Sequence, residues 1–159
     1  MQKERDNIYL ERAIELSKLG MQSGLGGPFG CVVVLNDEII GEGTNQVTSS
    51  NDPTAHAEVV AIRMACNKLG SYQLTGCEIF ASCEPCPMCL GAIYWARPKR
   101  VVYANTKEEA AEIEFDDQFI YNEISTGMRD RKIPFIHHPH PKAKEVFEEW
   151  KNWSGKMKY

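Results

Sequence analysis

The alternation of apolar and polar residues along the chain predicts a series of helices and strands. Some stretches repeat apolar residues at helical spacing, whereas short apolar runs bounded by turn residues are typical of buried strands. Gly20 and Gly70 stand where two helical patterns stop, and glycine often ends a helix. In chain order, we expect a helix over 6–20, strands over 31–35 and 38–43, a helix over 57–69, a strand over 78–82, a helix from 87 to before 98, a strand over 100–104 and a short helix over 107–112.

The order of these elements predicts an α/β protein built in layers. The first two strands are separated by a two-residue turn and form an antiparallel hairpin, whereas the next two are joined by a helix and should be parallel. Residues 133–136 predict a fifth strand, which Pro134 marks as an edge strand. A final amphipathic helix is expected over 142–153.

The bulk properties indicate one globular domain over residues 1–159. A net charge of −4 disfavours a nucleic-acid partner, because such proteins usually carry a basic patch. The chain shows no apolar run of about 18 residues and no signal-peptide pattern, so we expect a cytoplasmic protein without a membrane partner. In that setting the six cysteines are better explained as metal ligands and buried thiols than as disulfides.

Two short stretches carry the candidate chemistry. His56 and Glu58 stand two residues apart in one of them, and in the other Pro85 precedes Cys86 and Cys89. This H-x-E and P-C-x-x-C pair is the signature of zinc deaminases that act on nucleobases. Zinc binds imidazole and thiolate ligands tetrahedrally, and three protein ligands leave one position for water, as in catalytic sites. We therefore predict His56, Cys86 and Cys89 as zinc ligands and Glu58 as the group that moves protons.

The local sequence should place these side chains at helix ends. Asp52 or Thr54 is expected to cap the helix that begins near His56. Pro87 suits the first position of the next helix, whose N-terminal end favours the thiolate form of the cysteines.

Other interpretations of these motifs remain open. A C-x-x-C pair also occurs in redox sites and in structural zinc sites, and Cys83 could supply a fourth ligand to a zinc-binding module without enzymatic activity. The histidines at 137, 138 and 140 are better explained as exposed loop residues than as a second metal site.

Three further positions could line a pocket for a planar ligand. The glycine-rich stretch 24–30 lets the backbone approach a ligand, and Phe29 within it either stacks on a base or joins the core. Asn45 carries a donor and an acceptor, which suits a nucleobase edge, although by itself it is better explained as a turn residue. The stretch 115–121 mixes aromatic residues with two acids. On a surface helix it would form a solvated face with an apolar underside, whereas in a pocket an acid such as Asp117 beside aromatic residues could bind an amidine-like edge.

These motifs resemble the cytidine-deaminase superfamily, and within it the small bacterial guanine deaminases. The resemblance is carried by residues 26–30, 50–58, 82–97 and 115–121 and by the terminal tyrosine, whereas residues 105–114 lie outside the matching segments. It implies a three-layer sandwich with a central five-stranded mixed sheet and helices on both faces. It also implies zinc-dependent hydrolysis of guanine to xanthine and ammonia.

The same resemblance implies the parts of the site. One zinc ion per subunit would be held by His56, Cys86 and Cys89, with Glu58 as proton shuttle. The substrate-binding residues would be Phe29, Asn45, Ala57, Asp117 and Tyr159.

Members of this kind are homodimers that exchange C-terminal segments, here residues 142–159, so Tyr159 would close the partner's site. The alternative substrates are the wobble adenosine of tRNA, cytosine and other free aminated heterocycles.

Overall fold

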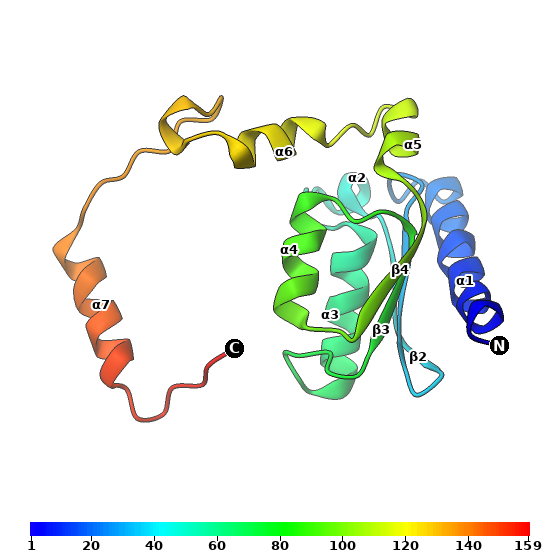
Figure 1. Cartoon of the computed structure of the whole chain (residues 1–159), viewed down its shortest axis with the longest axis horizontal. Coiled ribbons are helices and arrows are strands. Elements are labelled where there is room, and N and C mark those ends of the chain that lie inside the picture. Colours follow the sequence, from blue (N-terminus) through cyan, green and yellow to red (C-terminus); the bar gives the residue numbers. More distant parts are fainter. The chain divides into compact units, whose positions relative to one another are not determined.

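The computed structural model describes residues 1–159 and divides into two compact units, Met1–Asp117 and Gln118–Tyr159. Figure 1 shows the course of the chain through both units. The first unit contains α1 (Gln2–Gln22), β1 (Gly30–Leu35), β2 (Glu38–Thr44), α2 (Val47–Ser50), α3 (Ala57–Leu69), β3 (Glu78–Cys83), α4 (Pro87–Ala96), β4 (Arg100–Asn105) and α5 (Lys107–Glu112). The second contains α6 (Gln118–Ser125), the 3₁₀ turn η1 (Met128–Asp130) and α7 (Pro141–Asn152).

The sheet of the first unit has four strands in the order β2-β1-β3-β4. Strand β1 is antiparallel to both β2 and β3, and β3 is parallel to β4, so the predicted hairpin and the predicted parallel pair are confirmed. The parallel register places Cys83 opposite Asn105, which brings the carboxyl ends of β3 and β4 to the same edge of the sheet.

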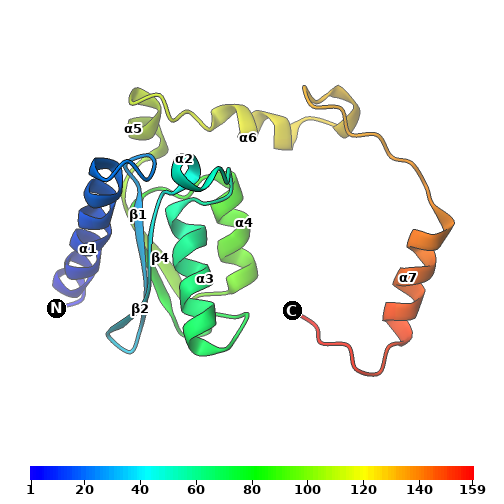
Figure 2. The same cartoon turned by 180° about the vertical axis from the view of Figure 1, so that it is seen from behind.

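The sheet separates two apolar layers because successive strand residues point to opposite faces. On one face Val32, Val34 and Phe80 pack with residues of α1. On the other face Cys31, Val33, Ile79 and Ala81 pack with residues of α3 and α4. Figures 1 and 2 show α1 on one side of the sheet and the α3–α4 pair on the other. The predicted α/β sandwich with helices on both faces is confirmed.

The expectation of a fifth strand is wrong. Residues 133–136 adopt no strand, and they belong to the second unit, where the side chains of Ile133 and Ile136 are exposed. Pro134 has no N–H to donate to a ladder, and the next proline follows five residues later, so this short run cannot build a stable pairing by itself.

One close approach between strand and helix positions α3. A Cβ atom added at Gly43 would lie 2.1 Å from the carbonyl oxygen of Ala57 and 2.7 Å from the amide nitrogen of Ala61. Only glycine allows the backbone of β2 to come this near to the first turn of α3. Because His56 and Glu58 flank Ala57, the contact between Gly43 and Ala57 determines how close both residues lie to the sheet.

The second unit has a helix with an exposed apolar face. Helix α7 confirms the predicted final amphipathic helix to within a residue at each end. Its exposed apolar side chains are those of Val146, Phe147, Trp150 and the following Trp153. None of the helices in either unit combines the length and the apolarity that crossing a bilayer requires.

Replacing Gly43 with alanine is expected to lower the free energy of unfolding by about 1–3 kcal/mol, because the new methyl group would collide with the backbone of α3. Urea unfolding followed by circular dichroism measures this change. Gly91→Ala in α4 is the matched control, since nothing lies within 4 Å of the added Cβ and alanine favours a helix by up to about 1 kcal/mol. If the Gly43→Ala protein had the same free energy of unfolding as the parent, the close approach of β2 and α3 would not contribute to stability.

Candidate metal centre and active site

His56 stands at the very start of α3. It is the N-cap residue in extended conformation, with φ −70° and ψ 154°. The expectation that Asp52 or Thr54 caps this helix is wrong. The Asp52 carboxylate instead accepts hydrogen bonds from the amide nitrogen of Thr54 at 2.8 Å and from its hydroxyl at 2.7 Å. Asp52 and Thr54 therefore belong to a turn that precedes the helix, and the helix begins with His56 as its N-cap.

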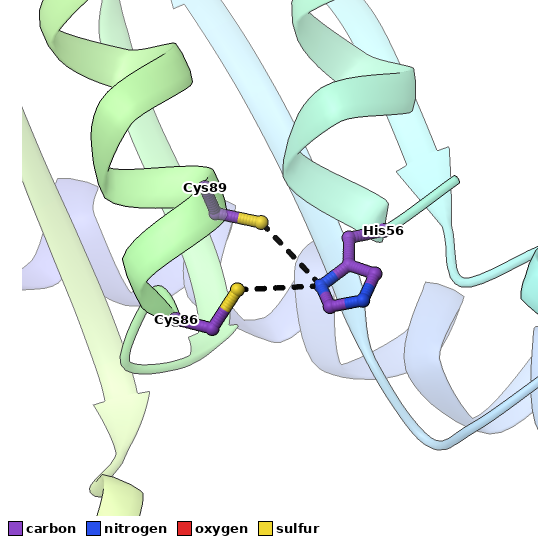
Figure 3. A group of neighbouring side chains, drawn as sticks. All are labelled: His56, Cys86 and Cys89. Carbon is purple, nitrogen blue, oxygen red and sulfur yellow. Dashed lines mark hydrogen bonds between the residues drawn. The ribbon is translucent and has the colours of Figure 1, made fainter. Parts of the chain in front are cut away.

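Cys86 and Cys89 come from the first turn of α4. Cys86 is the N-cap residue and Pro87 occupies the first turn, as predicted. The amide of Leu90 donates to the Cys86 carbonyl at 2.8 Å, so the helix turns immediately after the first cysteine. Figure 3 shows both thiols pointing from α4 toward the imidazole of His56.

The three side chains form a group with the dimensions of a zinc site. The Nδ1 atom of His56 lies 3.5 Å from the Sγ of Cys86 and 3.5 Å from the Sγ of Cys89, and all three ligand atoms lie within 4.8 Å of one another. Zinc–sulfur bonds of about 2.3 Å and zinc–nitrogen bonds of about 2.0 Å at tetrahedral angles give an N···S separation of about 3.5 Å. The donor set therefore fits zinc without rearrangement.

No fourth protein ligand joins this group. The Sγ of Cys83 contacts the carbonyl oxygen of Thr106 at 3.6 Å, and burial raises the pKa of this thiol to about 11. The alternative of a structural site closed by Cys83 finds no support in this geometry. The histidines at 137, 138 and 140 form no metal-binding group either.

The electrostatics favour a thiolate at the metal site. The hydrogen bond with the Cys89 thiol and then that with His56 lower the pKa of Cys86 to about 4. The same shared proton, together with burial, raises the pKa of Cys89. The hydrogen bond with Cys86 raises the pKa of His56. A divalent cation replaces the protons held within this group, which is the usual coupling between metal binding and deprotonation.

Glu58 is a buried carboxyl group beside the sulfur ligands. It lies in the first turn of α3 with only 8% of its surface exposed, and its Oε2 atom is 3.4 Å from the Sγ of Cys89. Burial raises the pKa of Glu58. General acid–base catalysis works best when the pKa of the acting group approaches the operating pH, so this upward shift favours Glu58 as a proton-transfer group.

Asn45 and Phe29 are held together near the glycine-rich stretch. The amide nitrogen of Asn45 donates to the carbonyl of Phe29 at 3.1 Å. The Oδ1 atom of Asn45 accepts from the amides of Gly27 at 3.3 Å and Val47 at 3.2 Å. These two bonds fix the orientation of the side-chain amide and leave its Nδ2 group to donate to a ligand. Asn45 is therefore a buried, oriented residue rather than an ordinary turn residue.

Asp117 is the last residue of the first unit, and it lies close enough to Cys86 for the charge of that thiolate to affect its pKa. Burial and then the negative charge of Cys86 raise the pKa of Asp117. Two residues earlier, the ring of Phe115 meets the ring of Phe29 edge to face, with centroids 4.9 Å apart. Ala57 is buried between His56 and Glu58. Tyr159 belongs to the second unit, and its side chain is exposed.

Two further polar side chains support the site and were not singled out from the sequence. The buried hydroxyl of Ser82 accepts from the amide of Gly30 at 2.9 Å, which ties the strand after Phe29 to the strand before Cys83. The carboxylate of Glu84 accepts from the amide of Lys107 at 3.2 Å. The only sequence signal for either residue is its position directly before the P-C-x-x-C motif.

Comparisons with known proteins agree with this geometry. Residues 3–105 match the cytidine and deoxycytidylate deaminase zinc-binding region. Over 151 residues the chain is 54% identical to a guanine deaminase from Bacillus subtilis (strain 168), covering 95% of this chain and 97% of that protein. A crystal structure of guanine deaminase from B. subtilis superposes with a TM-score of 0.94 and covers 96% of this chain and 98% of that one.

Other relatives are more distant. A tRNA-specific adenosine deaminase from Buchnera aphidicola (subsp. Schizaphis graminum) is 33% identical over 132 residues, covering 83% of this chain and 87% of that protein. A solved structure of guanine deaminase from Nitrosomonas europaea is 31% identical, with a TM-score of 0.64 over 69% of this chain and 63% of that one.

Replacing Cys86 or Cys89 with alanine is expected to lower bound zinc from about one equivalent per chain to below about a tenth, because two ligands hold the ion poorly. Atomic absorption after dialysis measures the content. Cys83→Ala is the matched control and should keep its zinc, since this thiol faces the Thr106 carbonyl. Zinc lost from the Cys83→Ala protein but kept by the Cys89→Ala protein would identify Cys83 as a ligand instead.

Proposed function

The chain belongs to the cytidine and deoxycytidylate deaminase zinc-binding family, and we propose that it hydrolyses guanine to xanthine and ammonia. The observation that carries this proposal is the 54% identity to a guanine deaminase along 95% of the chain. The three-ligand group beside a buried carboxyl group supplies the chemistry that a hydrolytic deaminase needs. The formal charge of −4 gives no support to a tRNA substrate.

The metal is one zinc ion per chain, held by the Nδ1 atom of His56 and the thiolates of Cys86 and Cys89. When bound, zinc lowers the pKa of a water molecule to about 7, so a nucleophile becomes available at neutral pH. The donor set and its 3.5 Å spacings support this assignment.

Glu58 moves the protons of the reaction. Its carboxylate accepts a proton from the attacking water as oxygen bonds to C2 of guanine, the carbon that bears the exocyclic amine. The protonated carboxyl group then donates this proton to a ring nitrogen. It next accepts the remaining proton of the new C2 hydroxyl group and delivers it to the amine, which leaves as ammonia while the C2 carbonyl forms. Its buried position and raised pKa support both roles, because each step needs the group in a different protonation state.

The remaining residues orient the base. Phe29 stacks on the purine, and the Nδ2 group of Asn45 donates to an acceptor on its edge. The backbone at Ala57 borders the reacting carbon, since Ala57 lies between His56 and Glu58. Asp117 accepts from an N–H group of the amidine edge. Two observations support these assignments: the side-chain amide of Asn45 is held in one orientation next to the backbone of Phe29, and Asp117 is near enough to Cys86 for its negative charge to raise the pKa of Asp117.

The active protein is a homodimer whose C-terminal segments, residues 142–159, are exchanged so that Tyr159 closes the partner's site. Two features support this proposal. Helix α7 exposes three large apolar side chains and Trp153 directly after it exposes a fourth, which implies a surface that covers them. Strand β4 ends the sheet on one side and leaves an edge that a further segment can pair with or cover.

The protein works in the cytoplasm. All six cysteines are free, and two of them must remain thiolates to hold the metal. A reducing compartment keeps them in that form, whereas an oxidising one favours disulfides.

The substrate assignment is tested by incubating the zinc-loaded protein with guanine, adenine, cytosine or a tRNA anticodon stem-loop and measuring ammonia. We expect release from guanine alone. The Glu58→Gln protein is the matched control: it should keep its zinc and lose about 10²–10⁴-fold in turnover, because glutamine cannot transfer the proton. Ammonia release from the stem-loop only would identify the protein as a tRNA deaminase. Near-normal turnover by the Glu58→Gln protein would show that Glu58 does not transfer the protons.

Deleting residues 155–159 is expected to spare zinc binding and to impair turnover, because the closing tyrosine is lost. Exchange between subunits is tested by co-expressing this truncated chain with the full-length Glu58→Gln chain. Each is impaired alone, but a mixed dimer combines an intact Glu58 in one subunit with an intact tail from the other. Recovered turnover in the mixture supports exchange, whereas no recovery shows that each tail serves its own site.

A further inference from the structure

The loop that carries Cys86 is bonded to the segment that leads to Asp117. Glu84 donates its backbone N–H to the carbonyl of Asn105 at 2.8 Å, continuing the parallel pairing of β3 and β4 by one residue. The neighbouring thiol of Cys83 contacts the carbonyl of Thr106 at 3.6 Å. The carboxylate of Glu84 then accepts from the amide of Lys107 at 3.2 Å. The last residue of β4 and the two residues that follow it are thus attached to the cysteine loop.

The bond to Lys107 differs from the other two because a carboxylate accepts it from a backbone amide, whereas the other two contacts end on backbone carbonyls. Lys107 is the first residue of α5, where backbone amides have no partner within the helix. Thr106 and Glu109 form a capping box at this end: the amide of Glu109 donates to the Thr106 hydroxyl at 3.3 Å, and the amide of Thr106 donates to the Glu109 carboxylate at 2.8 Å. Glu84, together with the contact of Cys83 to the Thr106 carbonyl, connects the helix start to the cysteine loop, and Glu84 stands two residues before a zinc ligand.

The far end of α5 is also held in one conformation. The amide of Phe115 donates to the carbonyl of Ala110 at 3.0 Å and that of Glu114 to Ala111 at 3.1 Å, which is the bonding pattern of a Schellman motif. Glu114 takes the left-handed position at φ +71°, which glycine usually occupies because a Cβ atom disfavours it. A residue is kept there only when its surroundings determine the conformation.

The contact that determines this conformation is made by Phe115. Its ring lies edge to face on Phe29, and a Cβ atom added at Gly27 would be 2.9 Å from its Cζ atom. The segment 106–117, which we call the Asp117 arm, is therefore fixed at its start by Glu84 and near its end by Phe115. Asp117 follows two residues after the second contact.

We propose that Glu84 is a positioning residue for the deamination, which holds the start of the Asp117 arm against the cysteine loop and so sets the distance from Asp117 to the metal site. The reaction needs this distance, because C2 must face the metal while the amidine edge meets Asp117. The inference rests on the proposed function for its substrate. A displacement of a substrate-positioning residue by about 1 Å can lower the rate about 10²-fold, so the loss of one hydrogen bond at the start of the arm can have a measurable effect on turnover.

The test compares Glu84→Ala, Glu84→Gln and the parent protein. Alanine removes the acceptor, and we expect unchanged zinc content, a fall in kcat/KM for guanine of about 10–100-fold, and a rise in KM from the displaced Asp117. The amide oxygen of glutamine still accepts from Lys107, so Glu84→Gln should stay within about threefold of the parent. Loss of zinc from Glu84→Ala, or failure of glutamine to rescue, would overturn the proposal.

Two controls separate positioning from a general loss of structure. Glu109→Ala breaks the capping bond within α5 but leaves the contact with Glu84, so its kcat/KM should stay within about threefold of the parent. In an Asp117→Asn background, Glu84→Ala should cost less than about threefold, because residues that act through one another are not additive. An equal loss in Glu109→Ala, or full additivity with Asp117→Asn, would contradict a role through Asp117.

A readout that needs no substrate keeps this inference separate from the proposed function. Hydrogen exchange of the amides at 107–115 should be at least about tenfold faster in Glu84→Ala than in the parent and near the parent rate in Glu84→Gln. Unchanged exchange in Glu84→Ala would overturn the anchoring even if guanine is the substrate. If guanine is not deaminated but the exchange pattern holds, the proposed function fails while the anchoring stands.

Discussion

The site depends on holding the first turns of two helices against each other on one face of the sheet. His56 begins α3 and Cys86 begins α4, and 30 residues of chain separate them, so only the packing of both helices on the sheet brings their side chains within 3.5 Å. The approach of Gly43 to Ala57 seats α3, and β3 leads directly into the cysteine loop. Both helix N-termini carry partial positive charge toward the site, which favours thiolates there.

The charges of the site explain why a carboxyl group is tolerated inside it. Burying Glu58 is unfavourable and the negative charge of Cys86 adds to the cost, whereas the hydrogen bond that the Cys89 thiol donates to the Glu58 carboxylate offsets part of it. Zn²⁺ with two thiolates and a neutral imidazole is formally neutral, so the metal compensates the sulfur ligands and leaves Glu58 as the titrating group. A bound metal would thus stabilise the two thiolates, and Glu58, whose charge the metal does not balance, would remain available for proton transfer.

Substrate choice within the family cannot come from the zinc ligands, since the H-x-E and P-C-x-x-C motifs are common to deaminases of different bases. It must come from groups around them, and the residues that we propose for this role are Asn45 with its fixed amide and Asp117 at the end of its arm. Both owe their orientation to backbone contacts: Asn45 to the amides of Gly27 and Val47, and the arm to the bonds at its two ends. The scaffold that holds the metal-binding group therefore also holds the residues that we propose to select the base.

The sequence by itself determined the elements and the metal chemistry, because both are local properties. Turn residues, apolar runs and Pro87 set the helices and strands of the first unit, and the spacing of His56, Cys86 and Cys89 predicted the group of side chains that the fold brings together. The fifth strand at 133–136 was wrong because four apolar residues do not specify a pairing partner. Only the tertiary structure decided that Asp52 closes a turn instead of capping α3, that Cys83 faces Thr106 instead of the metal group, and that Glu84 reaches Lys107. Each of these contacts depends on which residues meet in space, and the linear order of the chain does not contain that information.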